Sequence, residues 1–257
     1  MEHEPAPRWL VERLAAAGCI APEAEAAELV ATTSDEVDLA ALVARREQGE
    51  PLAWLTGRVR FGGLTLAIDT GVYVPRPQTE QLARRAAALL PDGGRAVDLC
   101  TGVGAIAALL QAAVPTARVV GVDLDPAAVA CAHRNGVAAV VGDLGGPLRP
   151  DLAADVVTAV APYVPTDALD LLPSDVRDHE PVRALDGGDD GLAVVRRIVT
   201  EAAGLLRPEG HLLVELGGDQ PEALAADLAA AGFALPDVWH DDEGDPRGLT
   251  ATLTGGP

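Results

Sequence analysis

The chain contains no lysine, three cysteines and one methionine among its 257 residues, and aromatic residues make up only 3% of it. Its 19 strongly basic residues are therefore all arginines, and 39 acidic residues outnumber them, which gives a formal net charge of −20. We attribute the bias toward alanine, glycine, proline, arginine and aspartate to a GC-rich coding sequence. A protein this acidic repels phosphate backbones, so nucleic acid is a poor candidate for the substrate.

The three cysteines, Cys19, Cys100 and Cys131, are too few and too scattered for a disulfide framework, and they suit reduced thiols in the cytoplasm. The cysteines and five histidines show no metal-ligand spacing, so we expect no metal. No apolar run is long enough to cross a membrane, and the acidic N-terminus is unlike a signal peptide. The sequence thus predicts a cytoplasmic protein without membrane contact, and we expect a monomer.

An apolar content of 49% supports a substantial core, with room for one large domain and a small appendage. Residues 1–50 are predicted to form a helical domain, because their apolar residues recur with helical spacing. Residues 51–76 alternate apolar and polar positions around Gly62-Gly63, which is the pattern of a β-hairpin linker.

Residues 77–257 alternate between apolar strand-like runs and helical segments. This alternation predicts an α/β fold with a doubly wound, mostly parallel sheet. No helix separates the last two strands, so we expect the final strand to enter antiparallel. The expected strands are 95–99, 117–123, 138–143, 154–160, 210–216, 237–240 and 249–254, and the expected helices are 78–90, 104–113, 126–135, 190–206 and 219–231.

The segment AVDLCTGVGAIA, residues 96–107, runs from a short strand into Gly102-x-Gly104-x-x-Ala107, which opens a helix. In this pattern the first glycine permits a tight turn and the second lets a ligand approach the backbone. The small third residue lets the helix pack close to the sheet. A glycine-rich turn alone is also compatible with an ordinary strand–helix connection.

Three acidic residues, Asp98, Asp123 and Asp143, lie at the carboxyl ends of three successive predicted strands. These ends line the crevice where open α/β sheets bind ligands. Asp123 stands where a carboxylate accepts hydrogen bonds from ribose hydroxyls, and Asp143 where it would face an adenine amino group. Asp98 beside the glycines suits an ammonium group and would repel a pyrophosphate, which favours S-adenosylmethionine over NAD. Asp125, followed by Pro126, is expected to cap the next helix.

The segments DLCTGVGAIA, VDLDPAAVACAHRN, GDL and APYVP, in that order, resemble the class I methyltransferases. More narrowly, the chain resembles the protein-(glutamine-N5) methyltransferases that modify peptide-chain release factors or a ribosomal protein. The resemblance extends through GEPLAWLTGRVRFGGLTLAIDTGVYVPRPQTE upstream, and through DVRDHEPVRALDGGDDGL and LLRPEGHLLVELGGDQ downstream. It implies a Rossmann-like methyltransferase domain that uses S-adenosylmethionine, with a helical N-terminal domain that docks a macromolecular substrate.

By this resemblance, residues 100–104 would wrap the methionine part of the cofactor, and Asp123 would hold its ribose. Asp143 and Leu144 would flank the adenine, and PRPQTE, residues 75–80, would close one wall of the pocket. The full set of expected cofactor-binding residues is Asp98, Cys100, Thr101, Gly102, Val103, Gly104, Asp123, Leu124, Asp143 and Leu144.

The stretch VVTAVAPYVP departs from the family pattern, because Val160, Ala161, Pro162 and Tyr163 stand where the family has Asn-Pro-Pro-Tyr. The resemblance implies that the Asn oxygen and the next residue's carbonyl accept the two N–H bonds of the acceptor amide, while the Tyr packs on its plane. Val160 accepts no hydrogen bond, and a buried unpaired donor costs about 1–3 kcal/mol. Val103, where the family often has Ser, is a milder departure.

Three interpretations of this site remain open. The protein is a glutamine methyltransferase in which water or another polar side chain replaces the Asn, a methyltransferase for a small-molecule amine, hydroxyl or carboxylate, or a cofactor-binding protein with little catalysis. Methylation of adenine in nucleic acid is disfavoured by the net charge. His179 and Glu180 offer an acid–base pair, although a loop that packs over the site is the simpler interpretation.

Overall fold

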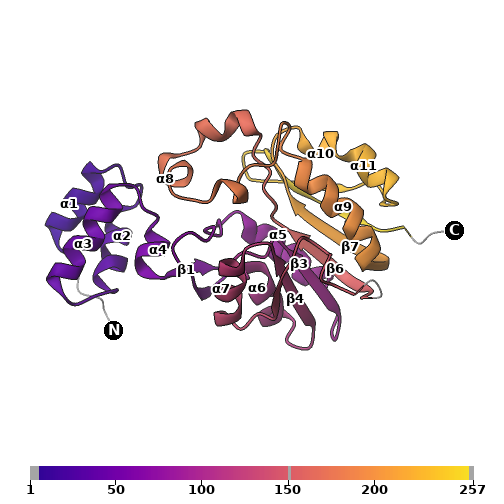
Figure 1. The fold of residues 1–257 in the computed structure, drawn as a ribbon, viewed down its shortest axis with the longest axis horizontal. Coiled ribbons are helices and arrows are strands. Elements are labelled where there is room, and N and C mark those ends of the chain that lie inside the picture. The colour runs from indigo at the N-terminus through magenta and orange to yellow at the C-terminus, as the bar shows by residue number, and fades with distance from the viewer. Residues whose placement is uncertain (1–5, 150–151, 255–257) are drawn as a thin grey trace.

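The computed structural model describes residues 6–149 and 152–254 (Figure 1). A helical unit, drawn in indigo at one end of the molecule, precedes a hairpin and a larger α/β domain. The helical unit has its own small core, to which Leu10, Leu29 and Leu55 contribute. Its helices are α1 (Arg8–Ala16), α2 (Pro22–Val30), α3 (Glu36–Glu47) and α4 (Leu52–Thr56).

The hairpin forms at the glycine pair where the sequence predicts it. Strand β1 (Arg58–Phe61) pairs antiparallel with β2 (Leu64–Ala67), and Gly62 and Gly63 between them have φ angles of 57° and 86°. A Cβ atom at Gly62 would come within 2.2 Å of a methyl carbon of Leu109. This glycine therefore lets the hairpin lie close to the α/β domain.

The central sheet has seven strands in the order β5-β4-β3-β6-β7-β9-β8. Strand β3 pairs in parallel with β4 and β6, whereas β9 is antiparallel to both β7 and β8. The predicted doubly wound sheet and its antiparallel final strand are confirmed. The strands are β3 (Arg95–Leu99), β4 (Arg118–Asp123), β5 (Ala139–Val141), β6 (Ala154–Ala159), β7 (Leu206–Glu215), β8 (Asp237–His240) and β9 (Pro246–Thr252).

Two hydrophobic clusters cover opposite faces of the sheet, because successive residues of a strand point to opposite sides. In β3, Ala96 packs into the cluster beneath α5, α6 and α7, whereas Val97 packs into the cluster beneath α9 and α11. No helix among the described residues is long and apolar enough to cross a membrane. The bounds are α5 (Thr79–Leu89), α6 (Ala105–Ala113), α7 (Pro126–Arg134), α9 (Ala193–Leu205), α10 (Gln220–Ala223) and α11 (Ala225–Ala230).

Between β6 and α9 the chain forms a covering segment, residues 164–186, which the sequence pattern did not divide into elements. It contains two 3₁₀ helices, η1 (Thr166–Leu171) and η2 (Val182–Ala184), and the short α8 (Ser174–Arg177). A parallel bridge between Val164 and Asp186 closes its base. The segment extends back toward the helical unit (Figure 1).

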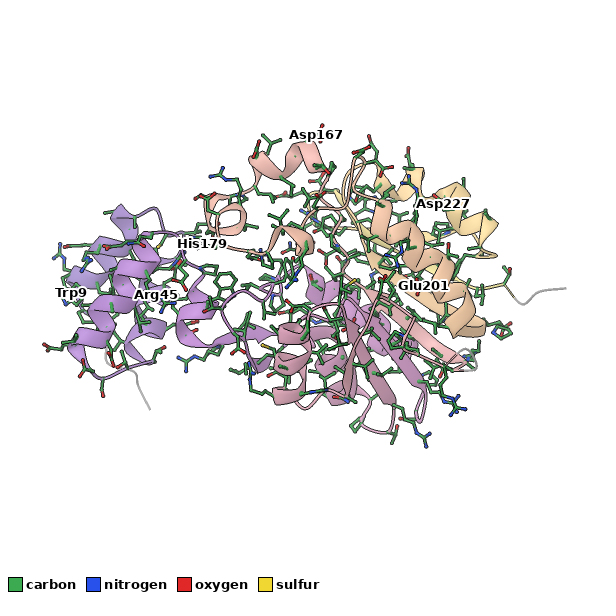
Figure 2. All side chains as sticks on the ribbon, viewed as in Figure 1. Trp9, Arg45, Asp167, His179, Glu201 and Asp227 are labelled. Carbon is green, nitrogen blue, oxygen red and sulfur yellow. The ribbon has the colours of Figure 1, made fainter. Side chains whose placement is uncertain are left out.

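His179 and Glu180 connect this covering segment to two different parts of the molecule. A ring nitrogen of His179 lies 3.1 Å from the backbone oxygen of Gln48 in the helical unit, and Figure 2 shows His179 on that side. The Glu180 carboxylate instead pairs with Arg76 at 2.5 Å and accepts the backbone N–H of Val74 at 3.4 Å. The two side chains have separate partners, which favours the simpler interpretation of a packing loop.

Asn135 joins the hairpin to the α/β domain. Its side-chain oxygen accepts the N–H of Ala67 at 2.7 Å, and its amide nitrogen donates to the carbonyls of Ala67 and Val103 at 2.9 and 2.8 Å. Alanine would leave these groups unpaired, so we expect Asn135→Ala to lower the free energy of unfolding by about 2–4 kcal/mol in urea titrations. Gln111→Ala, which removes a side chain without a hydrogen bond among the described residues, should change it by less than about 0.5 kcal/mol. Similar losses in both variants would contradict this role.

Candidate active site

The turn after β3 is built from left-handed residues at alternate positions. Cys100, Gly102 and Gly104 have φ angles of 55°, 57° and 80°. A Cβ atom at Gly102 would meet no atom within 4 Å, whereas one at Gly104 would come within 2.9 Å of the Val137 side chain. We expected the second glycine to admit the ligand, but Gly102 is the one that lines a cavity. Gly104 instead allows α6 to pack closely.

The Asp123 carboxylate is fixed at the end of β4 by two backbone groups. One oxygen accepts the N–H of Gly102 at 2.8 Å, and the other accepts the N–H of Asp125 at 2.9 Å. Burial raises the pKa of Asp123, and these bonds to the charged form oppose that shift. Each oxygen keeps a free lone pair, so the carboxylate remains able to accept hydrogen bonds from two neighbouring hydroxyls. Asp125 caps α7 as expected, accepting the N–H of Ala127.

A first cavity opens beside this turn. The predicted cofactor residues divide into two groups around it. Asp98, Thr101, Val103 and Gly104 are not part of its lining. Leu124 is 66% exposed, so a large apolar side chain is available to contact a flat ligand ring. The predicted residues that do line the cavity are Cys100, Gly102, Asp123, Leu124, Asp143 and Leu144.

Asp98 lies behind the turn and is only 1% exposed. Its two oxygens accept hydrogen bonds from the hydroxyls of Thr101 at 2.6 Å and Thr158 at 2.8 Å. Burial raises the pKa of Asp98 to about 6 in spite of these bonds. The observed contacts hold the turn against β6, and a direct contact with an ammonium group stays a prediction.

We expect Asp98→Asn to change how stability depends on pH. The pKa of Asp98 rises from 3.8 to about 6 on folding, so the native protein binds more protons than the unfolded chain within that window. The wild type therefore loses stability as the pH rises from about 4 to about 6, by up to about 3 kcal/mol from this group. Asparagine does not titrate, and threonine hydroxyls can donate to it or accept from it. Urea titrations should therefore show that the free energy of unfolding of Asp98→Asn rises relative to that of the wild type as the pH increases over this range.

Asp155→Asn is the matched control with the opposite sign. Against the effect of burial, hydrogen bonds from Arg207 and from the backbone of Arg95 lower the pKa of Asp155. As the pH rises through the range in which an ordinary carboxyl group titrates, the free energy of unfolding of the wild type should thus rise relative to that of Asp155→Asn. Parallel stability curves for the wild type and Asp98→Asn would contradict the prediction for Asp98.

Two arginines in the first cavity were not predicted from the sequence. Arg183 of η2 pairs with Asp125 at 2.5 Å, and Arg197 of α9 pairs with Asp143 at 2.9 Å. Both line the cavity. Among the described residues Asp123 has no ion pair, so the cavity retains an unbalanced negative charge, which suits a cationic ligand.

A second cavity adjoins the first, and the two share Tyr73, Val160 and Ala184 in their linings. Val160 therefore stands at their junction. Pro162 lines the first cavity, whereas Ala161 and Tyr163 line the second. The second cavity is otherwise lined by Arg76 and Gln78 of the predicted wall and by Val164, Leu172, Pro173, Val176 and Leu185.

Tyr163 is held in place by buried polar groups. Its hydroxyl donates to Glu215 at 2.9 Å, and Glu215, only 3% exposed, also accepts from the Thr79 hydroxyl at 2.6 Å. Burial raises the pKa of both Tyr163 and Glu215. The backbone oxygen of Tyr163 accepts from the Gln220 amide at 2.7 Å. The loop after β6 is thereby fixed to α5, β7 and α10.

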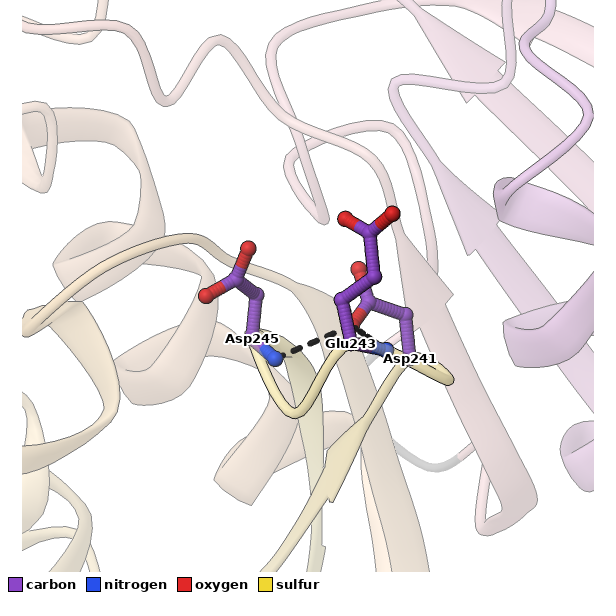
Figure 3. A group of neighbouring side chains, drawn as sticks. All are labelled: Asp241, Glu243 and Asp245. Carbon is purple, nitrogen blue, oxygen red and sulfur yellow. Dashed lines mark hydrogen bonds between the residues drawn. The ribbon is translucent and has the colours of Figure 1, made fainter.

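An acidic group lies away from these cavities, in the turn between β8 and β9. Figure 3 shows Asp241 accepting the backbone N–H groups of Glu243 and Asp245, at 3.0 and 2.9 Å. Its other oxygen accepts from Arg247 at 2.7 Å. These bonds account for the cluster as part of the turn, and we assign no metal to it.

The chain is similar to known proteins along most of its length. Residues 78–153 match the family model described as the methyltransferase small domain. The chain is 41% identical to the release factor glutamine methyltransferase of Mycolicibacterium smegmatis, over 93% of both chains. It is 40% identical to the Moorella thermoacetica protein of the same name, over 86% of this chain and 87% of the relative.

Solved structures share the fold at low sequence identity. The T. thermophilus 16S rRNA N2 G1207 methyltransferase, in complex with AdoMet and guanosine, superposes with a TM-score of 0.54 at 21% identity, over 76% of this chain and 49% of that one. The ribosomal protein L11 methylase from Lactobacillus delbrueckii subsp. bulgaricus gives a TM-score of 0.53 at 16% identity, over 73% of this chain and 84% of that one.

A sheet of this order with a ligand cavity at its glycine turn is the fold of the class I S-adenosylmethionine-dependent methyltransferases, and this protein is an enzyme of that class. The similarity to the Mycolicibacterium smegmatis relative covers 93% of this chain and 93% of the relative. The chain belongs to the release factor glutamine methyltransferase family. The family resemblance drawn from the sequence motifs is confirmed.

Proposed function

We propose that this protein methylates the side-chain nitrogen of a glutamine in a peptide-chain release factor. The observation that carries the proposal is the 41% identity, over 93% of the chain, to a relative named for that activity. A substrate-docking role for residues 1–50, with a linker at 51–76 and a catalytic domain at 77–257, belongs to the same proposal, as does a cytoplasmic monomer.

The residues present fit S-adenosylmethionine as the methyl donor. Gly102 leaves open space beside the turn, and Asp123 has lone pairs free for the two ribose hydroxyls. Leu124 and Leu144 offer apolar contacts to the adenine, with Asp143 beside them. When bound, this cofactor supplies a methyl group on a cationic sulfur, which the negative charge of the cavity favours.

The second cavity would receive the acceptor amide. Most of its lining residues are apolar, and the backbone carbonyl of Ala161 accepts no hydrogen bond among the described residues, so it is available to one N–H of the amide. Tyr163, fixed by Glu215, provides a rigid ring for the planar group. An amide nitrogen that enters this cavity reaches the first cavity at Val160, so the chain holds acceptor and donor in contact.

One observation favours a second candidate. The side chain of Val160 offers no hydrogen-bond acceptor at the junction, which suits a small acceptor without an N–H bond to satisfy, such as a carboxylate. That acceptor would not need the helical unit, so the candidate makes a separate prediction. Removing residues 1–50 should leave transfer to it unchanged.

Methyl transfer from labelled S-adenosylmethionine to the purified release factor of the same organism tests the proposal. We expect one methyl group per release factor, located on a glutamine by mass spectrometry and lost when that glutamine is replaced by alanine. The ribosomal protein acceptor known for the wider family serves as the comparison substrate. Saturating cofactor binding without any methylated release factor would refute the assignment.

A further inference from the structure

The acceptor site lacks one hydrogen-bond acceptor if the proposed function holds. A primary amide presents two N–H bonds and one carbonyl oxygen. The carbonyl of Ala161 accounts for one N–H, and the side chain of Val160 accounts for none. A desolvated N–H without a partner is costly, so a water or a polar group from another part of the second cavity has to accept it.

The second cavity contains four polar side chains, and two of them already have strong partners. The hydroxyl of Tyr163 donates to Glu215 at 2.9 Å. The guanidinium of Arg76 pairs with Glu180 at 2.5 Å and lies 5.0 Å from the centre of the Tyr73 ring. Tyr73 and Gln78 remain.

Tyr73 stands at the junction, because its side chain and that of Val160 line both cavities. Burial raises the pKa of Tyr73 to about 12, so the hydroxyl keeps its proton at neutral pH. Its neighbour Arg76 has only donors, and the described structure records no acceptor for the Tyr73 proton. The hydroxyl is therefore free to donate to a ligand.

Gln78 lies on the same segment, at the start of α5, and lines only the second cavity. Its side chain does not cap the helix and forms no hydrogen bond among the described residues. A carboxamide oxygen accepts an N–H bond as an asparagine oxygen does. Gln78 thus carries the functional group that residue 160 lacks.

We propose that the Tyr73 hydroxyl and the Gln78 carboxamide bind the amide of the acceptor glutamine and supply the contact that Val160 does not make. The Gln78 oxygen accepts one N–H of the acceptor, and the Ala161 carbonyl accepts the other. The Tyr73 hydroxyl donates to the acceptor's carbonyl oxygen. The inference rests on the proposed function, because it assumes that the acceptor is a primary amide.

Single substitutions test these contacts. Tyr73→Phe removes only the hydroxyl, and Gln78→Ala removes an exposed side chain, so the second variant is informative even if the first is poorly folded. Each should lower kcat/KM for the release factor by about ten- to a hundredfold. The dissociation constant of S-adenosylmethionine, measured by calorimetry, should stay within about threefold of the wild-type value.

Gln81→Ala is the matched control, because Gln81 lies one turn further along α5 and its amide donates to the backbone of His240, outside the cavities. Its kcat/KM should stay within about twofold of the wild-type value. A Gln78→Ala variant that keeps wild-type kcat/KM would overturn the inference while the proposed function stands. If Tyr73→Phe loses as much affinity for S-adenosylmethionine as it loses in kcat/KM, the inference is also overturned, because Tyr73 would then act on the cofactor in the first cavity.

Val160→Asn tests whether an asparagine at position 160 can take over the contact that we assign to Gln78. In the Gln78→Ala background it should restore most of the lost kcat/KM, and its gain there should be at least about tenfold larger than its gain in the wild-type background. An equally large gain in kcat/KM in both backgrounds would show that no group of the wild type accepts the second N–H of the amide, which would contradict the inference. A wild type that binds cofactor and methylates no release factor refutes the proposed function, and the inference falls with it.

Discussion

We expect Asp123→Ala to raise the dissociation constant of S-adenosylmethionine at least about a hundredfold, because a carboxylate that accepts two hydroxyls contributes roughly 1.5–3 kcal/mol per bond. Its position does not depend on the ligand, since Gly102 and Asp125 hold both oxygens through their backbone N–H groups. Replacement by alanine leaves the N–H groups of Gly102 and Asp125 without this partner, so a urea titration of the variant accompanies the binding measurement and checks that it is folded. Calorimetric titration of the cofactor measures the effect.

Asp123→Asn is the sharper variant of this experiment. The amide has the shape of the carboxylate, but its nitrogen would face a backbone N–H of Gly102 or Asp125, and neither can accept a hydrogen bond. We expect a loss of cofactor affinity as large as that of the alanine variant. Asp237→Ala, an acid on edge strand β8 that lies outside the cavity, should bind the cofactor like the wild type. A dissociation constant within threefold of wild type in both Asp123 variants would contradict the ribose role.

Gly191→Ala should abolish most methyl transfer by displacing the acceptor loop. Gly191 has a φ angle of 72°, and a Cβ atom there would come within 2.2 Å of the Tyr163 carbonyl oxygen and 2.4 Å of the Gln220 side-chain nitrogen. These two atoms form the hydrogen bond that holds the loop. We expect kcat to fall by about a hundredfold and the free energy of unfolding to fall by about 3 kcal/mol or more. Single-turnover kinetics and urea titration measure the two effects.

Gly218→Ala separates the effect of the clash from that of the backbone angle. Gly218 also has a positive φ angle, 53°, but a Cβ atom there would meet nothing within 4 Å. Its cost should be limited to the left-handed conformation, about 1–2 kcal/mol, and kcat should stay near the wild-type value. Equal losses of kcat in the two variants would show that contact with Tyr163 and Gln220 is not the cause.

The seven strands and most of the main helices of the α/β domain follow from the sequence, because their apolar residues recur with a regular period. The helix predicted over residues 219–231 is instead divided at Leu224 into α10 and α11. The cap of α7 was predicted from Asp125 and Pro126 alone, since capping depends on adjacent residues. Strand β7 begins earlier than expected, at Leu206, because its first residue pairs with Ala154 across a register shift. The covering segment was not divided into elements, because its helices are too short to show a period.

By itself the sequence determined the class of the enzyme, the cofactor turn and the departure at Val160. Each of these depends on neighbouring residues in a motif, where the order along the chain fixes the local geometry. Only the tertiary structure decided the partners within the site. Arg183 and Asp125 are 58 residues apart, and Tyr163 and Glu215 are 52 apart. The meeting of the two cavities at Tyr73 and Val160 was likewise invisible in the sequence, because it depends on how the hairpin end packs against the sheet and on which way each side chain points.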